Sequence, residues 1–257
     1  ISKHLKWDHT SPVTTIACGS SFNIVTCADG SVLSFGSGEC GELGRVCQPM
    51  RDSVTDEYDN QTILVEMLTP GLMYKTHPQT KKREIMKNAK SVGCGSYHAM
   101  VVDTGGGLYT CGLNNYGQLG HNDLESRDTL TFVEALRDIP IQLAKGGMHH
   151  SLLLTCPCGP GDNTQGNLIG IGRADSGQLG IPSLADLDAG SCAIYPVVPL
   201  CKGKTDIQPI FTDIDCGTNH NLALSSTGDV YSWGYGDMLA LGHGKEADEK
   251  QPRKIDM

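Results

Sequence analysis

The sequence has few aromatic residues and comparatively few cations. Of its 257 residues 5% are aromatic, and 20 Lys and Arg stand against 29 Asp and Glu, a formal net charge of -9. This balance argues against a nucleic-acid-binding surface spread over the whole chain, because such a surface needs many cations to displace counterions. A basic protein partner suits the charge better.

Long apolar runs and the common catalytic motifs are also missing. No stretch approaches the roughly 20 apolar residues of a membrane span, so we expect no membrane partner. There is no GxxxxGK phosphate loop, and the glycines of residues 36–41 belong to a repeat rather than to a dinucleotide site. Without paired carboxylates, or a nucleophile beside a base, we expect no covalent chemistry, no cofactor and no small-molecule substrate.

The cysteines are numerous, but they form neither a disulfide framework nor a metal site. The chain has 11 Cys, an odd number at irregular spacings, so we expect reduced thiols. Cys156 and Cys158 lack a second metal-ligating pair at finger-like spacing, so no metal is expected. Cys18, Cys94 and Cys216 each precede a glycine in the same local context, and we interpret them as small buried residues.

Glycine is abundant, with 32 residues, and much of it lies in a repeat. Residues 18–44, 94–120 and 216–242 align without gaps, and residues 146–180 form a further copy with an insertion of about eight residues around 156–163. We place the four repeat units near residues 17–45, 93–121, 145–181 and 215–243 of a single domain, 1–257, with a long connecting loop at 46–90.

Each repeat predicts a β-hairpin. In the last copy an apolar run at 221–224 is followed by a turn at 226–229 and an alternating run at 230–233. No segment shows a sustained helical period, which predicts an all-β protein. Units too small to bury their own sheet must stack on their neighbours, and four-stranded antiparallel units do so radially. The predicted fold is therefore a β-propeller.

The combination of CGxxH, GxVYSWG and GQLG resembles the repeat of the regulator of chromosome condensation family, whose members build a seven-bladed propeller. LGRV at residues 43–46, GGMHH at 146–150 and GRADSGQLG at 172–180 are similar to consecutive blades of its Ran guanine-nucleotide exchange factors. The resemblance implies about four blades of an expected seven. It also implies an exchange factor for the small GTPase Ran, acting without covalent chemistry through one propeller face, in the nucleus or otherwise in the cytoplasm.

The resemblance further implies partner-binding residues. Arg45 follows the closing glycine of LGRV, and His150, next to His149, matches the family histidine of GGMHH. Ser21 stands where the family has an aspartate, a departure that weakens the exchange interpretation. The family's protruding wedge strand, which presses on the nucleotide site of Ran, has no counterpart in this sequence.

Two interpretations of the histidines remain open. The third position after the first glycine of each repeat holds Phe22, His98, His150 and His220. A histidine there is largely a requirement of the blade, so we interpret His98 and His220 as structural. For His150 a partner contact and a structural role are both retained.

The partner and the extent of the domain also admit more than one interpretation. The basic run at 75–90 suits a nuclear import signal, a chromatin or histone contact, or a plain solvated loop. A non-catalytic interaction propeller, used as a scaffold or with a ligase, is the alternative function. We expect further blades before Ile1 and after Met257, with Trp7 and residues 12–16 completing an incomplete blade; a small closed propeller is the alternative.

Overall fold

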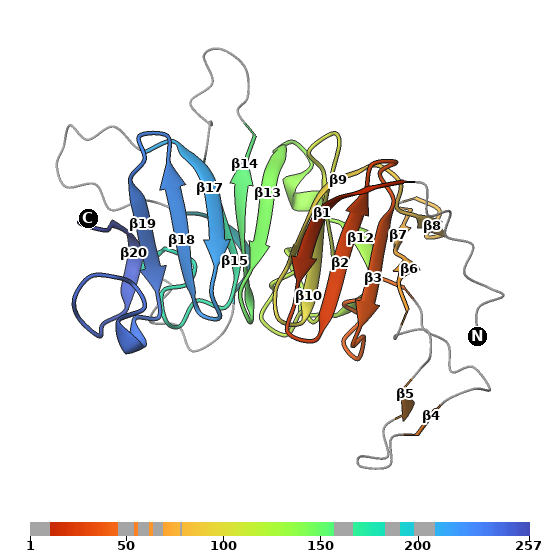
Figure 1. Ribbon diagram of the computed structural model, residues 1–257, viewed down its shortest axis with the longest axis horizontal. Helices are drawn as coiled ribbons and strands as arrows, with labels where there is room; N and C mark the ends of the chain where they lie inside the picture. Colours follow the sequence, from red (N-terminus) through yellow and green to blue (C-terminus); the bar gives the residue numbers. More distant parts are fainter. Residues whose placement is uncertain are drawn as a thin grey trace.

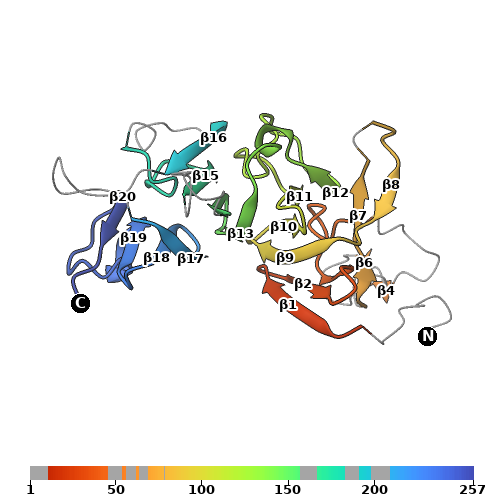
Figure 2. The same ribbon diagram turned by 90° about the horizontal axis from the view of Figure 1, so that it is seen from above.

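The computed structural model describes residues 11–45, 54–55, 62–63, 69–77, 79–156, 167–182, 191–197 and 209–257. Four antiparallel sheets follow one another along the chain and form an arc (Figures 1 and 2). Their first strands lie next to one another along the inner side of the arc (Figure 2). Each sheet is one blade, so the predicted all-β propeller architecture with four blades is confirmed.

The blades have the following strands. Blade 1 consists of β1 (Val13–Cys18), β2 (Phe22–Cys27), β3 (Val32–Gly36) and β6 (Gly71–Leu72). Blade 2 consists of β9 (Ala89–Cys94), β10 (His98–Asp103), β11 (Leu108–Gly112) and β12 (Arg127–Phe132). Blade 3 consists of β13 (Ile141–Gly146), β14 (His150–Thr155), β15 (Leu168–Gly172) and β16 (Ser191–Val197). Blade 4 consists of β17 (Phe211–Cys216), β18 (His220–Ser225), β19 (Val230–Gly234) and β20 (Glu249–Lys254).

The remaining elements are short. Two 3-10 turns, η2 (Glu134–Leu136) and η4 (Asp237–Leu239), lie in blades 2 and 4, and β4 (Val54–Thr55) pairs with β5 (Thr62–Ile63). No helix in the described part of the chain is long and apolar enough to cross a membrane.

The long loop predicted at 46–90 needs correction, because much of its second half is sheet. β6 completes blade 1, and β7 (Tyr74–Thr76) pairs in parallel with β12 and antiparallel with β8 (Arg83–Ile85). Met73 and Met86, which flank this hairpin, are fully buried. The basic run at 75–90 is thus a hairpin anchored on blade 2 rather than a solvated loop.

The amino-terminal assignment also changes. Residues 12–16 do not complete a separate blade, because β1 pairs directly with β2 and is the first strand of blade 1. Trp7 lies outside the described residues.

Three hydrophobic clusters form the core, and each lies between two neighbouring blades. Side chains alternate along a strand, so Ala99 and Val101 of β10 pack toward blade 1, whereas Met100 and Val102 pack toward blade 3. Trp233 of blade 4 packs on Leu152 of blade 3 in the third cluster. Stacking between blades therefore supplies the burial that a single blade lacks.

Among the described residues, exposure rises at the first blade of the arc, where these residues supply a neighbouring blade on one side. Ile16 of β1 is 73% exposed, whereas Val92, at the same repeat position in blade 2, is 9% exposed. The expectation that all three repeat cysteines are buried holds for Cys94 alone, since Cys18 is exposed and Cys216 is partly exposed.

Candidate partner-binding face

One face of the arc carries two loops from every blade, one between the first two strands and one after the third strand. We call it the repeat-loop face; it is the lower edge in Figure 1. Within blades 2 and 3 these loops are joined by hydrogen bonds from Leu113 N–H to Tyr97 O and from Arg173 N–H to His149 O, both 2.9 Å. The face is therefore built from backbone contacts that the repeat places in the same way each time.

Neighbouring blades are also joined across this face. Ser96 N–H donates to Gly147 O at 2.9 Å, and Met148 N–H donates to Thr218 O at 2.8 Å. These bonds run from blade 2 to blade 3 and from blade 3 to blade 4. Loops held in this way present side chains to a partner from a rigid support.

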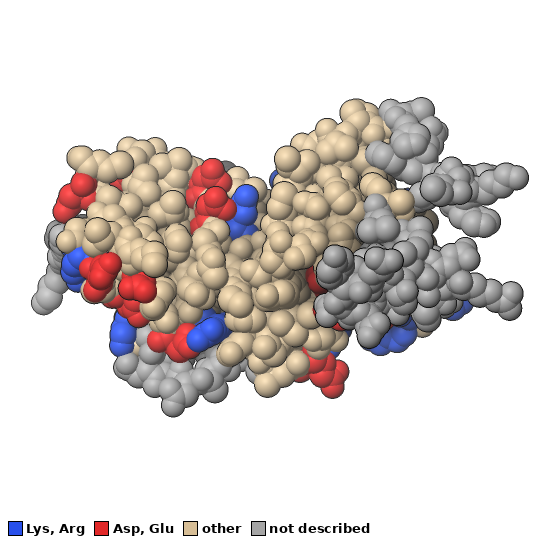
Figure 3. Space-filling view, turned by 60° about the horizontal axis from the view of Figure 1, so that its bottom comes forward, with Lys and Arg blue, Asp and Glu red and all other residues tan. Residues whose placement is uncertain are grey.

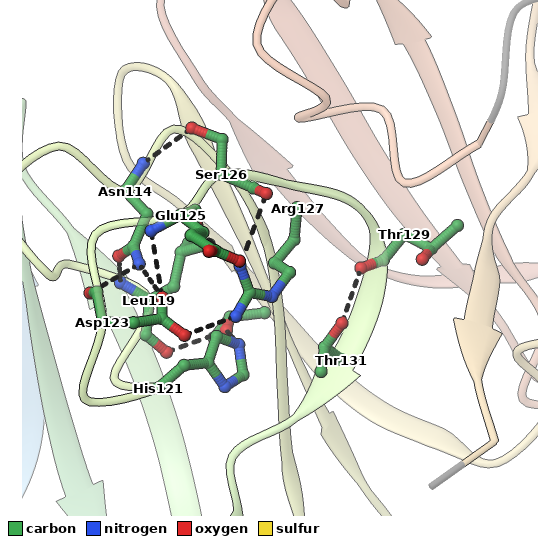
Figure 4. A network of polar contacts seen from close by, with 10 residues as sticks. Asn114, Leu119, His121, Asp123, Glu125, Ser126, Arg127, Thr129 and Thr131 are labelled. Atoms are coloured by element: carbon green, nitrogen blue, oxygen red, sulfur yellow. Dashed lines mark hydrogen bonds and ion pairs between the residues drawn. The ribbon is translucent and has the colours of Figure 1, made fainter. Parts of the chain in front are cut away.

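The loop after each third strand, which we call the closing loop, is fixed by its own side chains. Gln118 Oε1 accepts a hydrogen bond from Tyr116 N–H, and Gln178 Oε1 accepts one from Ser176 N–H, both at 2.9 Å. In blade 2, Asn114 Oδ1 accepts a hydrogen bond from Leu119 N–H at 2.9 Å, and Asn114 Nδ2 donates one to Asp123 Oδ1 at 3.0 Å (Figure 4). These bonds hold Tyr116 at the surface in one position.

Five side chains of blades 2 and 3 meet on the repeat-loop face, and we call them the aromatic–arginine cluster: Tyr97, Tyr116, His149, Arg173 and Asp175. The His149 ring lies near both tyrosines, with centroid distances of 6.0 Å to Tyr97 and 4.8 Å to Tyr116. The Arg173 guanidinium lies 5.3 Å from the centroid of the Tyr116 ring. All five side chains are partly exposed, so a partner can reach them.

The charges of this cluster are set by its neighbours. Burial first, and the Arg173 cation second, lower the pKa of His149, so its ring is neutral at pH 7. Burial raises the pKa of Asp175, but hydrogen bonds from Arg173 and Gln178 outweigh this and hold it below its usual value. His149 Nδ1 is buried and has no hydrogen-bond partner among the described residues. The cluster thus offers stacking surfaces and a paired cation to a protein partner.

His150 does not belong to this exposed cluster, and of the two interpretations left open for it the burial favours the structural role. Its side chain is 1% exposed, and its Nε2 lies 2.8 Å from Asn221 Oδ1 of blade 4. Asn221 Nδ2 in turn donates to Gln178 O at 2.8 Å, so the Asn221 carbonyl accepts the proton of His150 Nε2. His150 therefore joins blades 3 and 4 from the interior.

The same pairing rule explains the other repeat histidines. His98 Nε2 lies 2.8 Å from Ser151 Oγ. The third residue after the first glycine of the blade-2 repeat therefore bonds the fourth residue after the first glycine of the blade-3 repeat. In blade 1 the third residue is Phe22, and it packs in the same cluster as Ala99, the fourth residue of blade 2. His98 is structural, as expected; His220 holds this position in the last described blade and is partly exposed.

The remaining predicted site residues are divided between blades. His149 lies in the aromatic–arginine cluster, whereas Ser21 and Arg45 lie on blade 1. Ser21 is exposed, and Arg45 is partly exposed, with its guanidinium donating to Thr69 O at 3.0 Å.

The other four members of the cluster were not predicted from the sequence. Tyr97, Tyr116 and Arg173 occupy loop positions at which all four copies differ, and this difference could have identified them. Asp175 carries no such signal, because blade 4 has Asp237 at the same position.

The surface on this side is largely uncharged. With the repeat-loop side brought forward in Figure 3, wide uncharged areas lie between small groups of acidic and basic side chains. The fold is that of a β-propeller, a class of protein in which the loops of several blades carry side chains on one face.

The chain belongs to the RCC1-like domain family, whose model matches residues 3–257. It is 29% identical over 248 residues to Protein pim1 of Schizosaccharomyces pombe, covering 92% of this chain and 40% of that protein. It is 27% identical over 278 residues to the ultraviolet-B receptor UVR8 of Arabidopsis thaliana, covering 96% and 59%. The chain spans about half the length of the curated relatives it matches.

Solved structures agree on the fold. The crystal structure of Prp20p from Saccharomyces cerevisiae, described with its binding properties to Gsp1p and histones, matches with a TM-score of 0.68 at 22% identity. The match covers 96% of this chain and 51% of that one. At this identity the likeness concerns the arrangement of the blades.

Proposed function

We propose that this chain promotes guanine-nucleotide exchange on a small GTPase of the Ran kind, and that it does so by protein contact from the repeat-loop face. The observation that carries the proposal is the aromatic–arginine cluster on that face, in a chain of the RCC1-like domain family. Its His149 and Arg173 lie within GGMHH and GRADSGQLG, the segments most similar to exchange factors. A nuclear location, with histones as further partners, belongs to the same proposal.

The proposed mechanism is linkage between two binding events. The exchanger binds the nucleotide-free GTPase more tightly than the nucleotide-bound form, so exchanger and nucleotide weaken each other's affinity by the same factor. Aromatic anchors and arginine are the residue types that dominate such interfaces. No covalent step is required of this chain.

Removing the central ring of the cluster is expected to slow exchange. His149→Ala takes away the ring that lies near both Tyr97 and Tyr116, and we expect nucleotide release from a Ran-type GTPase to slow about tenfold.

Arg45→Glu is expected to weaken association with the GTPase through charge reversal, with an effect that shrinks as the salt concentration rises. Release of a fluorescent GDP analogue measures both.

Asn219→Ala is the matched control, because Asn219 occupies in blade 4 the repeat position that His149 occupies in blade 3. Its exchange rate should equal that of the unmodified chain. Equal rates for His149→Ala and Asn219→Ala would remove the cluster from the exchange site.

A second function, a non-catalytic interaction propeller, is favoured by two observations. Ser21 replaces the aspartate of the exchange factors on blade 1, and one RCC1-like relative carries the name of a light receptor rather than of an exchange factor. In that case the chain would bind the GTPase, or another partner, without accelerating nucleotide release.

A further inference from the structure

The closing loop of blade 3 combines three side chains that the other closing loops do not. Counted from the glycine that ends the third strand, its first, third and sixth residues are Arg173, Asp175 and Gln178. Blade 1 has serine, glutamate and glutamate at these positions, blade 2 has leucine, asparagine and glutamine, and blade 4 has tyrosine, aspartate and alanine. Among the four repeats, arginine, carboxylate and amide thus occur together in the blade that gives the aromatic–arginine cluster its cation.

Arg173 and Asp175 form an ion pair that uses one edge of the guanidinium. Arg173 Nε lies 2.9 Å from both carboxylate oxygens of Asp175, and Arg173 Nη2 lies 2.5 Å from Oδ2. The Arg173 side chain is 31% exposed, and its Nη1 makes no hydrogen bond to any residue that the structure describes. The pair therefore leaves the two Nη1 donors for another acceptor.

The amide of Gln178 holds Asp175 in place for this pair. Gln178 is 2% exposed, its Oε1 accepts the Ser176 N–H at 2.9 Å, and its Nε2 donates to Asp175 Oδ1 at 3.2 Å. Its backbone carbonyl is fixed by blade 4, because Asn221 Nδ2 donates to Gln178 O at 2.8 Å. A buried residue bonded to blade 4 thus orients the carboxylate that holds Arg173.

The guanidinium also contacts blade 2. Its central carbon lies 5.3 Å from the centroid of the Tyr116 ring. Gly172, which precedes Arg173, allows this approach, because it has φ 108° and a Cβ there would lie 3.1 Å from Gln118 Cβ. Held by a ring and a carboxylate, Arg173 presents its remaining donors from a fixed position. Less side-chain entropy is then lost when a partner binds it.

We propose that Gln178 is a positioning residue of the partner site. Its buried amide orients Asp175, and Asp175 in turn holds Arg173 so that Nη1 meets a carbonyl or carboxylate oxygen of the partner. Such oxygens are the acceptors that free guanidinium N–H groups select. Gln178 itself touches no partner atom, because its side chain is buried. The inference rests on the proposed binding of a Ran-type GTPase at the aromatic–arginine cluster.

Gln178→Glu tests the amide while keeping an oxygen that accepts the Ser176 N–H. Blade 1 already has the buried Glu42 at this position, and its Oε2 accepts the Cys40 N–H at 2.8 Å, so we expect the variant to fold. Burial raises the pKa of Glu42 against the opposing hydrogen bonds, and burial beside Asp175 should raise the pKa of the introduced carboxyl in the same way. When protonated this carboxyl can donate to Asp175 as the amide does, but when ionised it cannot.

The measurement is the affinity of the variant for a nucleotide-free Ran-type GTPase, divided by that of the unmodified chain, from about pH 6.5 to about pH 8. We expect the ratio to fall as the pH rises and to show a loss of at least about tenfold at the upper end. His149 and Asp175, whose pKa values are lowered, keep their charges over this range. Glu42→Gln, the reverse change at the same position of blade 1, is the matched control, and its ratio should not vary with pH.

A crystal structure of Gln178→Glu at about pH 8 supplies a measurement that needs no partner. We expect the Arg173 guanidinium to leave its present contacts with Asp175 and Tyr116. An unmoved guanidinium would overturn the proposal, and so would an affinity ratio that is the same at every pH. If the unmodified chain does not bind the GTPase at all, the proposed function is wrong, and the crystal structure alone then decides whether Gln178 positions Arg173.

Discussion

Replacing His150 with alanine is expected to lower the free energy of unfolding by about 3 kcal/mol. The substitution removes a buried ring and leaves the Asn221 carbonyl without its strong donor between blades 3 and 4. Asn221 and Trp233 Nε1 both bond Gln178 O, so the loss extends into a connected buried network. Urea unfolding followed by tryptophan fluorescence measures the change.

His220→Ala is the control, since His220 occupies the same repeat position in blade 4 and is partly exposed. We expect it to lower stability by less than about 1 kcal/mol. Equal destabilisation by the two substitutions would contradict the pairing between blades.

A double substitution tests the pair itself. His150→Phe with Asn221→Ala copies the Phe22 and Ala99 pair that blades 1 and 2 already use. Because both polar partners are removed together, the double variant should be less destabilised than the sum of the single ones, by about 1 kcal/mol. Additive losses would show that His150 and Asn221 do not act together.

Mild acid is expected to destabilise the protein more than most single substitutions. Burial, together with the neighbouring histidines, lowers the pKa of His98 to about 3. Burial also lowers the pKa of His150 to about 4, although the hydrogen bond to Asn221 opposes this shift. The unfolded chain binds these protons near pH 6.5 whereas the folded chain does not. Stability is therefore complete above pH 6.5 and falls by about 1.4 kcal/mol per histidine for each pH unit below it, until the folded pKa is reached.

Urea unfolding at a series of pH values from about 7 to about 5 measures this loss. His150→Gln keeps a donor but cannot titrate, so its pH dependence should be shallower by one proton. Hydrogen bonds from cationic partners lower the pKa values of Asp175 and Glu249 and outweigh the opposite effect of burial. These two carboxyl groups therefore add losses of stability only in stronger acid. A flat stability profile between pH 7 and about 5 would contradict the neutral buried histidines.

The repeat predicted the second and third strands of each blade, because these have a shared pattern of glycines and apolar runs, whereas residues 12–16 of the first strand were assigned to another blade. The fourth strands were less visible. β12 and β20 lie in segments without common residues, and the outer position of a blade tolerates sequence change. The β7–β8 hairpin was missed for a related reason, since its basic composition resembles a solvated loop while its anchors, Met73 and Met86, are two isolated apolar residues.

The candidate site was predicted only in part. His149 was identified, but the choice between a partner contact and a structural role for His150 stayed open because one blade was considered alone. Its burial depends on Asn221 of the next blade, and the pair becomes visible only when neighbouring repeats are compared position by position. The cluster around His149 combines residues from two blades, so no single repeat could reveal it.

Exchange by linked binding is tested by the affinity of this chain for a Ran-type GTPase in its nucleotide-free and GDP-bound forms, measured by titration under identical salt. Linked binding predicts that the nucleotide-free form binds about 100-fold more tightly and that the chain accelerates release of bound GDP. Equal affinity for the two forms would contradict exchange activity and would leave an interaction propeller that recognises its partner regardless of nucleotide.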